Sequence, residues 1–188
     1  FARLAASNTV VLFRPFHEMN GSWFWWGGKS TSQYIAAWQY MFNYLTATKG
    51  LHNILWVWSP NASLEWQYYP GNAFVDIVGT DNYNSQTIAK VPGYDSLDTY
   101  GKPYGITEWG ACDSSGSGCP ADISEFIPSL TSSMPKATFF CAWSYYFSLT
   151  YNTGASTMLN NSAVITRDEI SIPSDDTYKV IEDKTSHL

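Results

Sequence analysis

The chain has little positive charge and no long hydrophobic run. Lysine and arginine together number 10 against 16 acidic residues, so the 188-residue chain has a formal net charge of −6. This acidic balance argues against nucleic acid or an anionic membrane surface as a partner. No run of about eighteen apolar residues occurs, so we expect no transmembrane helix. The length suits one ordinary domain with a sizeable core.

Cysteine is also scarce, with three residues. Cys112 and Cys119 bracket a segment rich in glycine and serine, which allows a closed loop. A disulfide between them fits a secreted protein, and two free thiols are the alternative. Neither a second cysteine pair nor clustered histidines accompany them, so the pattern does not indicate a zinc site. Cys141 lies in an apolar run, and we expect it to be a buried free thiol.

Aromatic residues, in contrast, are abundant. They make up 17% of the chain and include nine tryptophans and thirteen tyrosines. Such a composition fits a tryptophan-rich core, and it also fits a carbohydrate-binding cleft. Several of the aromatic residues lie beside glycine, asparagine or aspartate in expected loops, so we expect both.

The segment 13–27 brings polar residues and several aromatic residues close together in the sequence. An apolar run over residues 9–13 leads into polar residues and then into four aromatic ones: Arg14, His17, Glu18 and Asn20, then Trp23, Phe24, Trp25 and Trp26. A carboxyl group at the end of a buried strand can donate a proton to a glycosidic oxygen. The alternatives without a role in chemistry are that Glu18 is a solvated loop residue and that His17 is a core histidine.

A second carboxylate occurs in a similar context. Residues 103–110 read Pro-Tyr-Gly-Ile-Thr-Glu-Trp-Gly, which predicts a short strand with Glu108 at its carboxyl end. A retaining glycoside hydrolase needs such a nucleophile roughly 5–5.5 Å from its acid. Here too the alternative is a solvated loop residue.

Both segments resemble glycoside hydrolase family 26, which contains β-mannanases and some related glucanases and xylanases. The pattern R-P-x-H-E-x-N-G-x-W-x-W-W-G of the family stands here from Arg14 to Gly27. The resemblance implies that Glu18 is the general acid/base and that Glu108, in a T-E-x-G motif, is the nucleophile. Trp109 stands where relatives usually have phenylalanine.

The same resemblance implies four substrate-binding residues. Tyr83, in a D-x-Y motif, would hydrogen-bond the nucleophile, and a packed loop tyrosine is the alternative. Trp143 would lie under the sugar at the cleavage point, Trp23 would line the site, and His17 would lie beside Glu18. For Arg14 we expect a supporting ion pair inside the barrel fold that the family adopts.

The chain alternates between strand-like and helix-like segments. The expected strands are 9–16, 53–59, 75–79, 103–108 and 137–143; the expected helices are 31–49, 94–101, 121–134 and 156–163. Thr31 or Ser32 would cap the first of these helices, and Gly50 would follow it. Such alternation predicts an α/β fold with a parallel sheet covered by helices.

The order of these elements matches strands four to eight of a (β/α)₈ TIM barrel. A full barrel takes about 250 residues, so we expect a barrel truncated to its C-terminal part. An open sheet of this kind exposes two strand edges, which is an aggregation hazard. We assign residues 1–173 to a partial glycoside hydrolase catalytic domain and residues 174–188 to a polar tail or linker.

The resemblance implies a function that can be stated concretely. We expect an endo-acting, retaining β-1,4-mannanase that is secreted and monomeric, with a mannan-type polysaccharide as its partner. The double-displacement chemistry requires no cofactor and no metal. Two alternatives are the same mechanism on β-1,3-1,4-glucan or β-1,3-xylan, and a non-catalytic carbohydrate-binding fragment.

Overall fold

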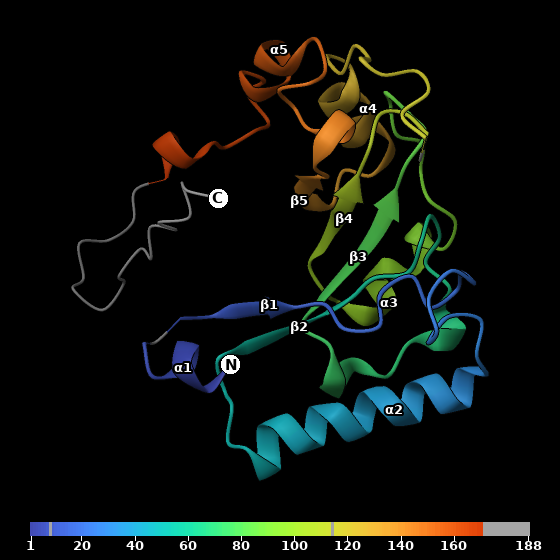
Figure 1. Ribbon diagram of the computed structural model, residues 1–188, viewed down its shortest axis with the longest axis vertical. Helices are drawn as coiled ribbons and strands as arrows, with labels where there is room; N and C mark the ends of the chain where they lie inside the picture. The colour runs from blue at the N-terminus through green and yellow to red at the C-terminus, as the bar shows by residue number, and fades with distance from the viewer. Residues whose placement is uncertain (8, 114, 171–188) are drawn as a thin grey trace.

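The computed structural model describes residues 1–7, 9–113 and 115–170 (Figure 1). The predicted tail at 174–188 and the predicted domain boundary at 173 lie outside the described residues. Among the described residues, no helix has the length and apolar character needed to cross a membrane.

A single parallel sheet carries the fold, as the alternating pattern predicts. Its strands lie in chain order, so each pairs with the next along the chain. In Figure 1 the sheet curls, with β1 and β2 running across the lower part and β3 and β4 turned upward from them. The five strands are β1 (Val11–Phe13), β2 (Ile54–Trp58), β3 (Ile77–Asn82), β4 (Tyr104–Trp109) and β5 (Ala137–Ala142).

Helices and short helical turns connect the strands. The α-helices are α1 (Ala2–Ala5), α2 (Thr31–Asn43), α3 (Leu97–Tyr100), α4 (Phe126–Ser133) and α5 (Ala155–Leu159). A π-helical turn over Tyr44–Thr48 extends α2. The 3-10 turns are Trp66–Tyr68, Asn72–Phe74, Tyr94–Ser96, Tyr145–Phe147 and Arg167–Glu169.

Helix α2 forms where the periodicity predicts it, but its cap differs from the expected one. The Ser30 hydroxyl accepts a hydrogen bond from the Gln33 amide at 3.3 Å, so Ser30 is the N-cap, and neither Thr31 nor Ser32 is. The expectation was one or two residues too late, because three hydroxyl residues stand in a row. Gly50 follows the helical segment with φ +63°, a conformation that glycine adopts without steric cost.

Helix α4 begins five residues later than the sequence predicts. Ala121 is held in extended structure instead, because its amide bonds the Asn152 side chain at 2.8 Å. The Ala121 carbonyl also accepts the Thr153 amide at 2.9 Å. These partners come from a distant segment, so the local helical pattern could not reveal them.

The core under β2 is built from large aromatic side chains. Trp38 of α2 is fully buried, and its indole N–H donates to the Phe74 carbonyl at 3.0 Å. Its ring lies 6.0 Å from that of Trp56 on β2, which also contacts Phe42 at 5.1 Å. These contacts pack α2 against β2.

The last strand is much less covered than its neighbour. All six residues of β4 are buried, whereas none of β5 is, since β5 pairs with a strand on one side only. Cys141 on β5 is exposed, so its predicted burial is wrong; an apolar run does not show whether a strand lies at a sheet edge. The predicted Cys112–Cys119 disulfide is present, with the Cα atoms 5.6 Å apart.

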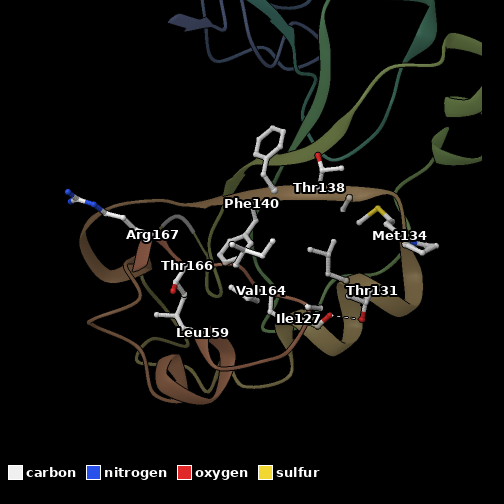
Figure 2. A pocket seen from close by; sticks show the side chains of 15 residues that line it. Ile127, Thr131, Met134, Thr138, Phe140, Leu159, Val164, Thr166 and Arg167 are labelled. Carbon is white, nitrogen blue, oxygen red and sulfur yellow. Dashed lines mark hydrogen bonds between the residues drawn. The ribbon is translucent and has the colours of Figure 1, made fainter. Parts of the chain in front are cut away.

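A hollow of about 470 Å³ lies between β5, α4 and the segment 159–167. Figure 2 shows Phe140 and Val164 at its walls, while Arg167 points away. None of the residues predicted to act on a sugar lines it. The hollow therefore belongs to the outer face of the sheet edge rather than to the predicted site.

Replacement of Trp38 by alanine tests this core. We expect the free energy of unfolding to fall by about 3–5 kcal/mol, because the change leaves a cavity and an unpaired Phe74 carbonyl. Urea unfolding measures the loss. Tyr40→Ala, on the exposed side of the same helix, is the matched control and should cost about 0.5 kcal/mol or less. Equal losses in both variants would contradict this account of the core.

Candidate active site

The chain turns sharply after β1, and this turn carries two of the predicted site residues, His17 and Glu18. Phe16 and Glu18 have φ angles of +49° and +53°, a left-handed conformation that is uncommon outside glycine. The Glu18 amide donates to the Ser59 carbonyl at 2.8 Å, which ties this turn to the end of β2. Backbone strain of this kind persists only where the surroundings fix it, and it gathers at functional sites.

Arg14 connects three strand ends. Its Nη1 donates to Asp81 Oδ2 at 2.6 Å, and its Nη2 donates to Glu108 Oε1. Arg14 follows β1, whereas Asp81 lies on β3 and Glu108 on β4. The predicted ion pair of Arg14 is therefore present, and it involves two carboxylates.

A register shift between β3 and β4 sets the direction of the Glu108 side chain. Thr80 pairs with Ile106 but Asp81 pairs with Glu108, so Thr107 is an extra residue in β4. Successive side chains of a regular strand point to opposite faces, and a bulge changes this. Here the Thr107 hydroxyl donates to Asp81 Oδ1 at 2.7 Å, while Glu108 accepts a hydrogen bond from Arg14. Gly79 makes room, because a Cβ there would overlap the Thr107 side chain.

Asp81 is fully buried and anchored on both of its oxygens. Besides Arg14 and Thr107, it accepts a hydrogen bond from the Ser59 hydroxyl at 3.0 Å. Burial raises the pKa of Asp81 to about 7, while Arg14 and the Thr107 hydroxyl favour its ionised form. The aspartate thus acts as a buried counter-ion that holds Arg14 in place.

Glu108 receives a second donor from the neighbouring strand. The Tyr83 hydroxyl donates to Glu108 Oε2 at 2.7 Å, so the structure brings these two predicted residues together. Burial raises the pKa of Tyr83 far above its usual value, and the bond to Glu108 raises it further. Tyr83 therefore keeps its proton. Each oxygen of Glu108 accepts one hydrogen bond, which orients the carboxylate.

Glu18 lies in a different environment. Burial raises the pKa of Glu18, and the negative charge of Glu108 adds to this rise. The indole N–H of Trp23 donates to Glu18 Oε2 at 2.5 Å and opposes it, as does Arg14. Trp23 itself is 57% exposed, so it combines this contact with a ring surface open to solvent.

His17 faces the same group of charges. Its Nε2 lies 3.9 Å from Glu108 Oε1, and its ring contacts Phe24. Burial lowers the pKa of His17, and the charge of Arg14 lowers it further, while Glu108 opposes the change. A neutral imidazole at this place can donate or accept one hydrogen bond at each nitrogen.

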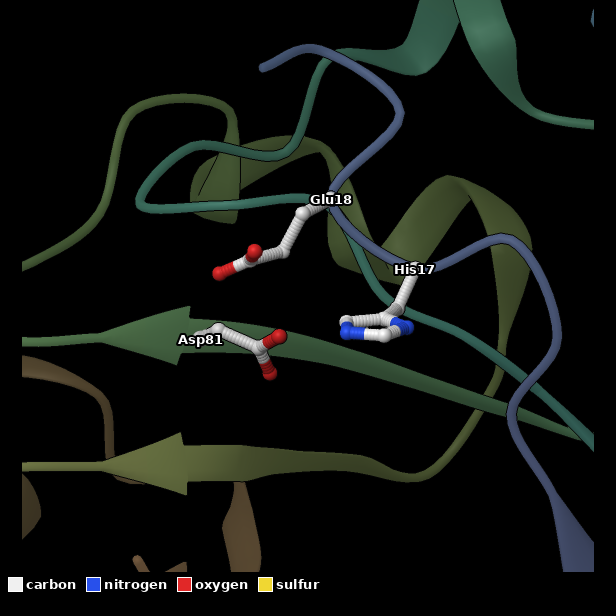
Figure 3. A group of neighbouring side chains, drawn as sticks. All are labelled: His17, Glu18 and Asp81. Atoms are coloured by element: carbon white, nitrogen blue, oxygen red, sulfur yellow. The ribbon is translucent and has the colours of Figure 1, made fainter. Parts of the chain in front are cut away.

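Figure 3 shows how closely His17, Glu18 and Asp81 gather. One nitrogen or oxygen atom from each of the three lies within 4.8 Å of the others, and these residue types bind metal ions. Both Asp81 oxygens already accept hydrogen bonds, and Arg14 brings a positive charge to the same carboxylate. A cation would have to displace Arg14, so the arrangement suits an organic substrate better than an ion.

Trp143 follows β5 at the far side of the curled sheet. Its amide donates to the Trp109 carbonyl at 2.9 Å, and its side chain is 45% exposed. Its predicted place under a sugar stays a prediction. Like Trp23, it offers an accessible aromatic surface at a strand end.

The sequence reasoning missed part of this network. Ser59, Thr107 and Asp81 were not predicted as site residues, although all three stand at or near a strand end. Asn20 was noticed only as part of a motif; its side chain exchanges two hydrogen bonds with the Asn61 backbone, each of 2.8 Å. It thereby joins the loops that follow β1 and β2. The position of Asp81 in the D-x-Y motif was the one available signal.

Comparison with known proteins supports the resemblance. The profile of glycosyl hydrolase family 26 matches residues 1–169. A mannan endo-1,4-β-mannosidase of Bacillus subtilis strain 168 is 39% identical over 170 residues, which are 85% of this chain and 46% of that protein. A relative from Caldalkalibacillus mannanilyticus, named mannan endo-1,4-β-mannosidase A and B, is 36% identical over 177 residues, or 89% of this chain and 34% of its own. An Endoglucanase H from Acetivibrio thermocellus is 30% identical over 93 residues, 43% of this chain and 10% of its own.

Solved structures give the same result. The Bacillus subtilis mannanase BCman superposes with a TM-score of 0.80 at 36% identity, covering 92% of this chain and 53% of that chain. GH26A from Muricauda sp. MAR_2010_75 gives 0.72 at 29% identity, covering 90% and 55%. The chain thus spans about half the length of the first curated relatives it matches. Its five parallel strands form part of a (β/α)₈ barrel, and the chain belongs to glycosyl hydrolase family 26.

Proposed function

We propose that the protein carrying this chain is a secreted, endo-acting, retaining β-1,4-mannanase. The observation that carries the proposal is the contrast between two neighbouring carboxyl groups. Glu108 accepts hydrogen bonds from Arg14 and Tyr83, whereas the pKa of Glu18 is raised by burial. A carboxyl group with a raised pKa suits the general acid, and a carboxylate held by a donor on each oxygen suits the nucleophile. The names of the relatives support mannan as substrate, and the disulfide supports secretion.

Glu108 is the nucleophile in this proposal. Its charge is stabilised by Arg14, and Tyr83 holds its second oxygen, so one lone pair can be aimed at the anomeric carbon. Attack forms a glycosyl–enzyme ester as the glycosidic C–O bond breaks. Two of the predicted binding residues support this step: Tyr83 by its hydrogen bond, and His17 by its closeness to Glu108.

Glu18 donates its proton to the leaving oxygen in the same step. Once Glu108 is esterified, its negative charge no longer raises the pKa of Glu18, so Glu18 then accepts a proton from the incoming water. Water attacks the anomeric carbon and the ester bond breaks, which retains the configuration. Trp23 and Trp143 would stack on the apolar faces of the sugar rings.

A β-glucan is the second candidate substrate. The matching Endoglucanase H favours it, although that match covers less than half of this chain. Since the catalytic groups would act alike on either backbone, only the substrate test distinguishes the two.

The substrate test compares reducing-sugar release from galactomannan and from barley β-glucan. We expect release from galactomannan to be faster by at least about tenfold, with Glu108→Ala as the inactive control whose turnover falls by about 10³-fold or more. Added azide should restore activity to that variant and give a product of inverted configuration. Faster release from β-glucan would support the second candidate, and near-normal turnover of Glu108→Ala would exclude Glu108 as the nucleophile.

Loss of the proposed acid should depend on the leaving group. Glu18→Ala should slow the hydrolysis of mannan severely, yet spare the first step on an aryl mannoside with an activated leaving group, because such a group needs no proton. Burst kinetics with the aryl substrate measure the first step separately. Equal losses on both substrates would mean that Glu18 positions the sugar and does not donate a proton.

The hydrogen bond from Trp23 should set the upper pH limit of activity. It favours the ionised form of Glu18, so its removal in Trp23→Phe should raise the pKa of Glu18 further. A general acid works while protonated, so the basic limb of the pH profile of kcat/KM should move to higher pH. Trp25→Phe, whose ring contacts Phe16 and Trp26 instead, is the matched control. An unmoved or lowered basic limb in Trp23→Phe would contradict the role of this bond.

A further inference from the structure

Tyr145 combines a strained backbone with an almost completely exposed ring. Its φ is +66°, which is rare for a bulky side chain, and its exposed fraction is 80%. It opens the 3-10 turn Tyr145–Phe147, two residues after Trp143 at the carboxyl end of β5. Active sites of barrels with parallel strands lie at this end. The ring is too exposed to stabilise the core, so packing of its own side chain does not offset the strain.

The surrounding backbone fixes this conformation. The Ser148 amide donates to the Tyr145 carbonyl at 3.0 Å. The buried Asn152 side chain donates to the carbonyls of Tyr146 and Ser148, each at 2.9 Å. A left-handed residue that its neighbours hold in this way is a fixed feature of the turn.

A row of aromatic contacts leads from Tyr145 to the proposed nucleophile. The ring of Tyr145 lies edge-on to that of Tyr146 at 5.0 Å, and Tyr146 contacts Phe147 at 4.9 Å. The buried Phe147 ring in turn lies 5.1 Å from Tyr83, which donates to Glu108. The turn is therefore packed against the wall of the site.

The disulfide loop supports the same turn from the other side. Gly116 lies inside the loop closed by Cys112 and Cys119, and a Cβ there would come within 3.2 Å of the Tyr146 ring. Tyr146 is thus held between this loop and Phe147. Because Tyr146 contacts the Tyr145 ring, the exposed ring of Tyr145 packs against a side chain that is itself held in place.

We propose that Tyr145 is a sugar-binding platform beyond the cleavage point, which extends the aromatic surface of Trp143 to a further unit of a β-1,4-linked polysaccharide. The inference rests on the proposed function for its ligand. A flat, preorganised ring loses little conformational entropy on binding and offers an apolar face to a pyranose ring. The strain at Tyr145 is then the cost of presenting that face outward.

The test uses two substitutions at Tyr145 itself. Glycine adopts φ +66° freely, so Tyr145→Gly keeps the turn and removes the ring. We expect its KM for mannohexaose to rise about tenfold, or ~1.4 kcal/mol, with the change concentrated in KM rather than in kcat. Tyr145→Trp should restore most of the affinity. Tyr40→Ala, which removes an exposed tyrosine from α2, is the control and should leave KM unchanged.

Migration in gels that contain galactomannan separates failure of this inference from failure of the proposed function. Retardation of the unaltered protein that is lost in Tyr145→Gly and regained in Tyr145→Trp supports the platform, even without hydrolysis. Hydrolysis of galactomannan together with an unchanged KM in Tyr145→Gly overturns the platform alone. Equal KM values in the Gly and Trp variants also overturn it. A protein that neither binds nor hydrolyses galactomannan refutes both proposals.

Discussion

The contact of Arg14 with Asp81 and Glu108 is the interaction on which the site depends. It joins the ends of β1, β3 and β4 through one guanidinium group. Without that positive charge, Asp81, Glu108 and Glu18 would lie close together with no compensating cation, and the pKa values of Asp81 and Glu18 would rise further. Removing one member of such a buried ion pair is costly because its partners remain charged. Arg14 therefore holds the strand ends together and limits how far burial raises the pKa values of Asp81 and Glu18.

Around this cation the two glutamates lie in different surroundings. Glu108 has a hydrogen-bond donor on each oxygen, while Glu18 is buried and accepts a hydrogen bond from the Trp23 indole. The aromatic residues contribute to both conditions. Tyr83 donates to one carboxylate, and Trp23 limits how far the pKa of the other rises. The Trp23 ring is also 57% exposed, so one side chain both contacts Glu18 and leaves an aromatic surface open to solvent.

Local patterns in the sequence predicted the features that depend on nearby residues. The periodicity of α2 and the strand predicted over residues 103–108 emerged from local patterns, whereas the contact of Tyr83 with Glu108 was implied by the resemblance to the family. The hydrogen bonds from Ser59 and Thr107 to Asp81 were not predicted, because Thr107 and Asp81 lie on different strands and Ser59 follows a third. The exposure of Cys141 and the late start of α4 were missed for a related reason: pairing at a sheet edge, and contacts with residues 152 and 153, involve distant parts of the chain.

The extra residue in β4 has a consequence for protein engineering. Thr107 and Glu108 are adjacent in sequence, yet both reach the group formed by Arg14 and Asp81, which a regular strand would not permit. A designer who copied the Thr-Glu pair onto an idealised barrel strand would place one of the two side chains on the wrong face. Any transplant of this chemistry must therefore carry the irregular backbone and the glycine opposite it, Gly79, together with the side chains.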